Sequence, residues 1–188
     1  SPDKRDEILG SVFYSQLLGA VLAISLIALT LFITNEDVST SVLILIISAS
    51  SFFLTFNVIF YYYRSKVNAK YSVYVLSTSV ILVALIKFAL IFIKAPLLFF
   101  LIAYACEFLF NAISYTIIYH SQKLKISVWK FDKNLALTLL KDSWPLILSG
   151  VVVSIYVKVD QVLIKNMLTS RDVGIYAAAV RLSESWYF

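Results

Sequence analysis

Long apolar runs separated by short polar segments dominate this chain. A helix needs about 20 predominantly apolar residues to cross the hydrocarbon core of a bilayer. Five runs reach that length, over residues 11–34, 41–63, 71–94, 96–119 and 145–168, and we expect a sixth span to begin near residue 173. These runs lack the polar stripe that a soluble amphipathic helix carries on every turn, so they predict membrane-spanning helices.

Composition favours the same class. Hydrophobic residues make up 61% of the 188 residues and charged residues 14%, whereas a soluble domain is about half apolar and about a quarter charged. A water-soluble fold of this size could not bury so much apolar surface. The predicted fold class is therefore all-α, a polytopic transmembrane helical bundle. Because the chain lacks an initiator Met and stops inside an apolar run, we expect it to be an excerpt of a longer protein.

Basic residues are distributed unevenly among the connections. They gather before the first run, after the second and after the fourth, as Lys4, Arg5, Arg64, Lys66, Lys70, Lys123, Lys125, Lys130, Lys133 and Lys141. The connection at 35–37 has none, and the other two carry only Lys94 and Arg171. By the positive-inside rule, the N-terminus, the second connection and the long fourth connection are expected to be cytoplasmic.

Aromatic residues and prolines mark the expected ends of the spans. Tyrosines cluster where the second span ends and the third begins, as membrane-interface residues do: Tyr61, Tyr62, Tyr63, Tyr71 and Tyr74. Pro96 and Pro145 stand where we expect helices to start, and Asp142 or Ser143 is the expected cap of the fifth helix.

The segment 120–144 is the one long connection. Within it, Phe131, Leu135, Leu139 and Leu140 recur at helical spacing. This pattern is typical of a short amphipathic helix on the membrane surface, and a helix packed under the bundle explains it equally well.

Six ionisable residues fall inside the apolar runs: Lys87, Glu107, Lys158, Asp160, Arg181 and Glu184. Charges at membrane depth are costly unless they are paired or line a wet cavity. Counting the helical rise outward from the short loop 169–172 places Asp160 level with Arg181, and Lys158 level with Glu184. Lys158 and Asp160 lie about 200° apart around a helix, so at most one of them meets the face that carries Arg181 and Glu184.

Two further patterns involve these charges. Lys87 and Glu107 differ by about 4–5 Å in depth, which a lysine side chain can span; they form either a clamp between two helices or part of a cavity. Lys158, Gln161 and Lys165 share one helix face, and such a cationic stripe favours anions.

These patterns define the candidate site. We predict substrate or cavity residues at Lys158, Arg181, Lys87 and Lys165, and ion-coupling or pairing residues at Asp160, Glu184 and Glu107. Buried carboxylates often carry protons in transporters, which is a hypothesis for Asp160 and Glu184.

No catalytic or metal-binding motif accompanies these charges. The sequence has no phosphate-binding loop, dinucleotide fingerprint or HExxH motif. Cys106 and His120 are its only cysteine and histidine, which excludes an internal disulfide. We expect no enzyme activity, no cofactor and no metal, and no nucleic-acid partner because the basic residues follow membrane topology.

Several short sequences carry a resemblance to a known family. They are SWP at 143–145, YVKVDQ at 156–161, VGIY at 173–176 and A-x-x-L-S-E-x-W-Y-F at 179–188, with FNVIFYYYRSKVNAKYSV at 56–73 as a weaker addition. Together they resemble polysaccharide-repeat (O-antigen or capsule) flippases, the Wzx-type members of the MOP (MATE-like) transporter superfamily.

The resemblance implies a fragment of a two-bundle transporter. Residues 1–119 would be helices 3–6 of the first bundle, 120–144 the cytoplasmic inter-bundle linker, and 145–188 helix 7 and the start of helix 8. It implies translocation of undecaprenyl-pyrophosphate-linked oligosaccharide repeat units across the bacterial inner membrane by alternating access. The implied partners are that lipid-linked oligosaccharide, the lipid bilayer, and polysaccharide polymerase and chain-length regulator proteins.

Two alternatives come from the same superfamily, a peptidoglycan lipid-precursor flippase and a MATE-type ion-coupled drug exporter. The exporter would need a cavity dominated by carboxylates, whereas the intramembrane charges here are three basic and three acidic residues. A membrane-embedded glycosyltransferase or polymerase would need a catalytic loop, and the outer connections are too short to hold one.

Overall fold

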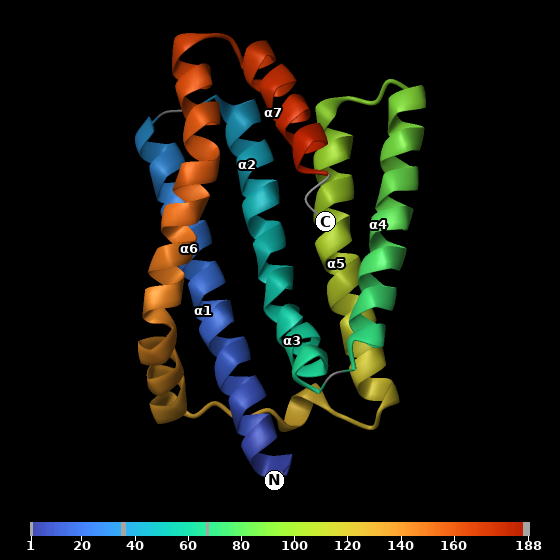
Figure 1. Cartoon of the computed structure of the whole chain (residues 1–188), viewed down its shortest axis with the longest axis vertical. Coiled ribbons are helices and arrows are strands. Elements are labelled where there is room, and N and C mark those ends of the chain that lie inside the picture. The colour runs from blue at the N-terminus through green and yellow to red at the C-terminus, as the bar shows by residue number, and fades with distance from the viewer. Residues whose placement is uncertain (1, 35–36, 67, 186–188) are drawn as a thin grey trace. The chain divides into compact units, whose positions relative to one another are not determined.

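The computed structural model describes residues 2–34, 37–66 and 68–185 (Figure 1). Its elements in chain order are α1 (Pro2–Thr34), α2 (Val38–Ser50), the 3₁₀ helix η1 (Ser51–Phe56), α3 (Asn57–Ser65), α4 (Ala69–Phe92), α5 (Leu97–Ser121), the 3₁₀ helix η2 (Ile126–Val128), α6 (Lys133–Met167) and α7 (Ser170–Glu184). Within the described ranges there is no strand, and five helical segments are long and apolar enough to cross a membrane. The prediction of an all-α polytopic bundle is confirmed.

The chain divides into two compact units. The N-terminal unit comprises Ser1–Ala136 and the C-terminal unit Leu137–Phe188. Part of the 35–37 connection and the last three residues of the 179–188 sequence lie outside the described residues.

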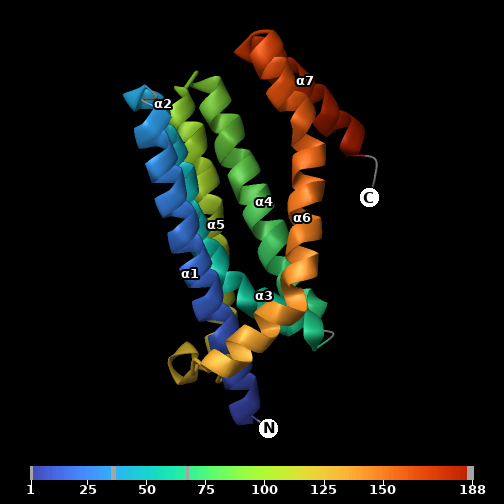
Figure 2. The ribbon, with the colours of Figure 1, turned by 90° about the vertical axis from the view of Figure 1, so that its left-hand side faces the viewer.

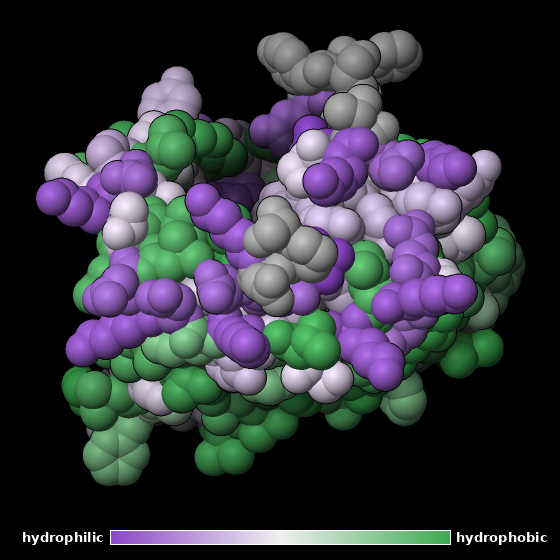
Figure 3. All heavy atoms as spheres, turned by 90° about the horizontal axis from the view of Figure 1, so that it is seen from below, coloured by the Kyte–Doolittle hydropathy of each residue, from purple (hydrophilic) through white to green (hydrophobic). Residues whose placement is uncertain are grey.

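The N-terminal unit is a bundle of four spans. Its second span is α2, η1 and α3 in succession, and α4 and α5 form a hairpin (Figure 1). The beginning of α1, the α3–α4 connection and the chain after α5 all lie at one end, the lower end in Figure 1. These are the segments in which the sequence concentrates its basic residues. Figure 3 views this end, where hydrophilic side chains gather.

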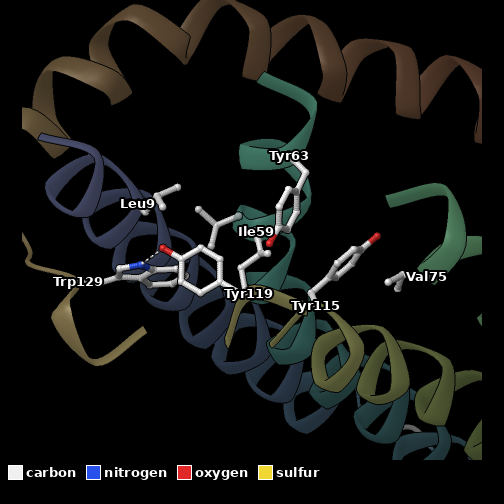
Figure 4. Close-up of a cluster of buried hydrophobic side chains, with 8 residues drawn as sticks. Leu9, Ile59, Tyr63, Val75, Tyr115, Tyr119 and Trp129 are labelled. Carbon is white, nitrogen blue, oxygen red and sulfur yellow. Dashed lines mark hydrogen bonds between the residues drawn. The ribbon is translucent and has the colours of Figure 1, made fainter. Parts of the chain in front are cut away.

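An aromatic core closes the basic end of the N-terminal unit. Its buried side chains come from α1, α3, α4, α5 and the connection after α5 (Figure 4): Leu9, Val58, Ile59, Tyr63, Val75, Tyr115, Tyr119 and Trp129. The indole Nε1 of Trp129 donates a hydrogen bond to the Tyr119 hydroxyl at 3.0 Å. Tyr63, expected at the lipid interface, is only 1% exposed, whereas Tyr61 and Tyr74 are exposed. The interface interpretation is therefore wrong for Tyr63, because its ring extends from α3 into the core and packs against the neighbouring helices.

The connection between α5 and α6 is hydrogen-bonded to α1. The Lys130 amide donates to the Asp6 carbonyl at 3.3 Å, and the Asp132 amide donates to the Ser11 hydroxyl at 3.0 Å. A Cβ at Gly10 would meet the Lys130 carbonyl oxygen and lie 2.7 Å from its amide nitrogen. The close approach of the two backbones thus requires glycine at position 10.

Two predictions about the start of α6 are wrong. It is continuous from Lys133 to Met167, with Pro145 in its interior, so Pro145 does not open it. Its first amides, those of Asn134 and Leu135, are capped by the Asp132 carboxylate at 2.8 and 3.0 Å, and not by Asp142 or Ser143. In contrast, Pro96 does directly precede α5, as expected.

A bend separates the first turns of α6 from the remainder (Figure 2). Proline lacks the amide that an interior helical residue donates to the carbonyl four residues earlier, here that of Lys141, and its ring clashes with that carbonyl. Such kinks arise at proline. The amphipathic stretch expected near 131–140 is thus mostly the first arm of a bent helix and not a separate element.

Candidate transport site in the α6–α7 hairpin

The C-terminal unit is a hairpin of α6 and α7 joined by a short turn. Thr169 and Asp172 form a capping box at the start of α7: the Asp172 amide donates to the Thr169 hydroxyl, and the Thr169 amide donates to the Asp172 carboxylate at 3.0 Å. The hydrogen bond from the Thr169 hydroxyl holds the pKa of Asp172 below its ordinary value. This cap fixes where α7 begins, and with it the depth of each α7 side chain relative to α6.

A polar cavity of about 350 Å³ lies within this hairpin. It is lined by Val157, Lys158, Gln161, Ala177, Ala178, Val180, Arg181 and Glu184. Lys158 and Gln161 are three residues apart on α6, and Arg181 and Glu184 are three apart on α7, so each pair presents one face to the cavity. Three of the four charges predicted for this hairpin therefore meet in one place.

The fourth charge, Asp160, is held elsewhere on α6. Its carboxylate accepts a hydrogen bond from the Tyr176 hydroxyl of α7 at 3.0 Å, and Asp160 is absent from the cavity lining. This agrees with the helical geometry, which allows only one of Lys158 and Asp160 to meet the face of Arg181 and Glu184. Tyr176 is a partner that the charge pattern did not indicate, because only ionisable residues were compared for depth.

The cavity charges are brought together without direct ion pairing. Among the described residues of the C-terminal unit, no ammonium or guanidinium forms an ion pair with a carboxylate. The cavity therefore has two cationic groups, Lys158 and Arg181, to one carboxylate, Glu184. Such an arrangement leaves positive charge for an anionic ligand.

Lys165, the last member of the predicted cationic stripe, lies near the turn. Its ammonium donates to the Ser170 hydroxyl at 2.6 Å, one residue past the Thr169 cap. It does not line the cavity that holds Lys158 and Gln161.

An apolar groove of about 680 Å³ runs along α6 beside the polar cavity. Its lining is Ile147, Gly150, Val151, Ser154, Ile155, Lys158, Val159 and Val162. Lys158 belongs to both the groove and the cavity, so a charged site and an apolar surface adjoin at this residue.

The remaining predicted charges form a contact in the N-terminal unit. The Lys87 ammonium lies 3.9 Å from the Glu107 carboxylate, so the expected contact between α4 and α5 is present. The same ammonium lies 5.5 Å from the centroid of the Tyr104 ring, within the range of a cation–π interaction. Lys87 is thus partnered, whereas Lys158 and Arg181 have no ion-pair partner among the described residues.

Comparison with known proteins places the chain in a family. Neither the curated proteins nor the solved structures contain a match to this sequence. Residues 1–184 match the family described as polysaccharide biosynthesis protein. The match spans both units, including the α6–α7 hairpin and its charges. The chain therefore belongs to the polysaccharide biosynthesis protein family, the family of Wzx-type flippases in the MOP transporter superfamily.

Proposed function

We propose that this protein moves an undecaprenyl-pyrophosphate-linked oligosaccharide from the cytoplasmic to the periplasmic leaflet of the bacterial inner membrane by alternating access. The family supports a role in polysaccharide-related transport. The observation that carries the proposal is the cavity of the α6–α7 hairpin, with Lys158 and Arg181 in its wall and no ion pair between them and a described carboxylate.

The cavity has the chemistry that a pyrophosphate needs. A multiply charged anion cannot enter hydrocarbon unaided, since burying an unpaired charge is very costly. Lysine and arginine offer charge-assisted hydrogen bonds to phosphate oxygens, and arginine can bind two at once. Glu184 lowers the net positive charge and so keeps the anion from binding too tightly for release.

The adjoining groove suits the lipid part of the same cargo. A prenyl chain is apolar, and the groove along α6 is lined almost entirely by aliphatic side chains. Because Lys158 borders both features, one molecule with a charged head and an apolar tail could occupy both. A cationic drug, the cargo of an exporter with a carboxylate-rich cavity, would be repelled by Lys158 and Arg181.

Orientation follows from charge. The end of the N-terminal unit at which α1 begins carries most of its basic residues, which favours placing that end in the cytoplasm. The segment 120–144 would then be the cytoplasmic linker between bundles, and polymerase and chain-length regulator proteins would act on the cargo after it has crossed.

Replacing the two cations tests the proposal. Lys158→Ala and Arg181→Ala, introduced into the gene that encodes this chain, should each lower surface polysaccharide at least tenfold, because each removes a charge-assisted contact worth about 1.5–3 kcal/mol. Lys125→Ala, at an exposed lysine of the connection after α5, is the matched control and should leave the polymer unchanged. Normal polymer in both cavity variants, at normal amounts of protein in the membrane, would overturn the proposal.

Coupling to an ion gradient is tested at the carboxylates. We propose that Asp160 or Glu184 carries the coupling proton or binds the coupling cation. Asp160→Asn and Glu184→Gln should then alter the dependence of transport on the proton gradient, and unchanged transport with unchanged proton dependence in both variants would exclude this role.

A further inference from the structure

The second span of the N-terminal unit is interrupted in its middle. Helix α2 ends at Ser50, the chain continues as the 3₁₀ helix η1 for six residues, and α3 starts at Asn57. A 3₁₀ stretch inside a longer helix is unusual because its hydrogen-bond geometry is poorer, and it often marks a functional position. No proline or glycine occurs in this stretch to explain the change.

The change of helix type aligns polar side chains. In a 3₁₀ helix, residues three apart are eclipsed, so Ser51, Leu54 and Asn57 form one row. All three line a pocket of about 450 Å³, together with Gln16 of α1, Thr55 and Tyr61. An uninterrupted α-helix would turn Asn57 away from the face of Ser51, since six α-helical residues advance 600°. The interruption thus assembles the pocket.

The side-chain amide oxygen of Gln16 has no hydrogen-bond partner among the described residues. This atom, Oε1, is buried. The Ser51 hydroxyl donates to the Ser48 carbonyl at the end of α2 at 2.6 Å, and the Thr55 hydroxyl donates to the Phe52 carbonyl at 2.8 Å. The lone pairs of both hydroxyls remain free to accept. A buried polar group without a partner is destabilising, so a ligand that supplies one gains binding energy.

The pocket lies inside the apolar part of the two spans, nearer their basic end. Gln16 is five residues beyond the start of the apolar run 11–34, about 8 Å along α1 at the rise of an α-helix. This is about a quarter of the way across a hydrocarbon core that is about 30 Å thick. Polar residues that faced lipid at that depth would be costly, whereas residues that line a water-filled path are tolerated. This face of α1 and η1 therefore belongs to a hydrated path.

Size and charge define the class of ligand. None of the described residues that line the pocket is charged, which disfavours phosphate. Its 450 Å³ lies in the range of small-molecule sites and is far larger than a dehydrated cation. Amide, hydroxyl and phenol groups donate and accept hydrogen bonds with hydroxyl groups, and Tyr61 and Leu54 add apolar surface for the faces of a ring.

We propose that a sugar ring of the cargo binds in this pocket, which is formed by Gln16, Tyr61 and the row of Ser51, Leu54 and Asn57. This inference rests on the proposed function, in which the cargo carries an oligosaccharide. Two parts of the cargo would then be recognised separately: the N-terminal unit would bind the uncharged sugar, and the C-terminal unit would bind the pyrophosphate.

Two probes distinguish recognition of the sugar from recognition of the pyrophosphate. Binding to the purified full-length protein in lipid nanodiscs is measured for the lipid-linked repeat unit extracted from the cells that carry the gene, and for undecaprenyl pyrophosphate without sugar. Gln16→Leu and Asn57→Leu should each weaken binding of the sugar-bearing lipid about tenfold, the effect of one lost hydrogen bond, and leave undecaprenyl pyrophosphate unaffected. Lys158→Gln should weaken both. Ser25→Leu, at an exposed α1 residue outside the pocket, should change neither.

Thermal stability distinguishes a binding residue from a structural one. Gln16→Leu removes a buried amide oxygen that has no described partner and should keep or raise the melting temperature of the ligand-free protein. A lower melting temperature, or an equal loss for both probes, would overturn the sugar site. So would unchanged binding of both probes in the Gln16 and Asn57 variants, a result that leaves the proposed function standing. If the unaltered protein bound neither probe, the proposed function would fail and the sugar site with it.

Discussion

The two units of this chain have similar compositions but differ in how their side chains are buried and how their charges are paired. In the N-terminal unit, side chains from four helices and a connecting loop bury one another around Trp129 and Tyr119, and the intramembrane lysine, Lys87, has a partner. In the C-terminal unit, α6 and α7 bury none of their described residues, and Lys158 and Arg181 have no described ion-pair partner. The first unit has a packed core, and in the second unit the charges of Lys158 and Arg181 stay unpaired among the described residues.

The difference shows that hydrophobicity alone does not reveal how a span is used. Both units contain long apolar helices with charges inside them. What separates them is whether each charge is satisfied within its own unit, because an unsatisfied charge at membrane depth needs water or a ligand. The contrast predicts that substitutions in the N-terminal unit change mainly stability and those in the C-terminal unit mainly transport.

The largest effect on stability is expected at Trp129. This side chain is 7% exposed and packs edge-to-face on Phe13 and Tyr119, so Trp129→Ala should lower the free energy of unfolding by about 3–5 kcal/mol. Trp144→Ala in α6 is the control, because Trp144 is 58% exposed and should cost less than about 1 kcal/mol. Denaturant titration of the purified protein measures both, and equal losses would show that the two units are packed alike.

A glycine in each unit offers a second comparison. Gly10→Ala would force a Cβ against the backbone of Lys130, and we expect a loss of about 1–3 kcal/mol with loosening of the α5–α6 connection. Gly150→Ala in α6 has nothing within 4 Å of the new Cβ and should stabilise the helix by about 0.5–1 kcal/mol. Hydrogen exchange at residues 122–132 reads out the connection, and unchanged exchange in the Gly10 variant would refute the close approach.

The Lys87–Glu107 contact should behave as a coupled pair. Lys87→Met leaves Glu107 without its cation and is expected to destabilise the protein more than the double variant Lys87→Met/Glu107→Met, with a coupling energy of about 1 kcal/mol. Lys158→Met should leave stability nearly unchanged while it lowers transport. Additive effects of the two single substitutions would show that the Lys87–Glu107 contact contributes nothing.

The smallest effect is expected at the start of α7. Thr169→Ala removes the side chain that caps this helix and should speed amide exchange in its first turn about twofold, the effect of about 0.5 kcal/mol, whereas Ser183→Ala near its other end should not.

The pKa of Asp172 is lowered in the folded protein, so its contribution to stability is present above the ordinary pKa of 3.8 and is lost as pH falls through the lowered value. Exchange in the first turn should therefore be constant between about pH 5 and 8 once corrected for the intrinsic rate, and a further change in that window would show that another group controls the cap.

Much of the fold follows from simple periodicity and length. The five spans and the helix start after Pro96 were predictable because apolar length is a strong signal. Helical rise also predicted the contact between Lys87 and Glu107. Helical geometry predicted that at most one of Lys158 and Asp160 meets the face of Arg181 and Glu184, and the structure shows that it is Lys158.

Other features depend on tertiary packing and left no local signal. Pro145 has the same sequence context as a helix start, yet Asp132 caps the helix thirteen residues earlier and the proline lies in the helix interior. The 3₁₀ interruption at Ser51–Phe56 has no glycine or proline to announce it, so the pocket at Gln16 was not foreseen. Tyr63 and Trp129 belong to a core whose members come from five segments, a grouping that spacing along one helix cannot show.

The most direct measurement follows the cargo itself. In cells that carry Lys158→Ala together with Arg181→Ala, the fraction of lipid-linked repeat unit reached by a membrane-impermeant lectin in spheroplasts should fall at least tenfold while the total amount of that lipid rises. A lectin-accessible fraction equal to that of cells with the unaltered protein, at equal amounts of protein in the membrane, would contradict the assignment of the α6–α7 cavity as the site of transport.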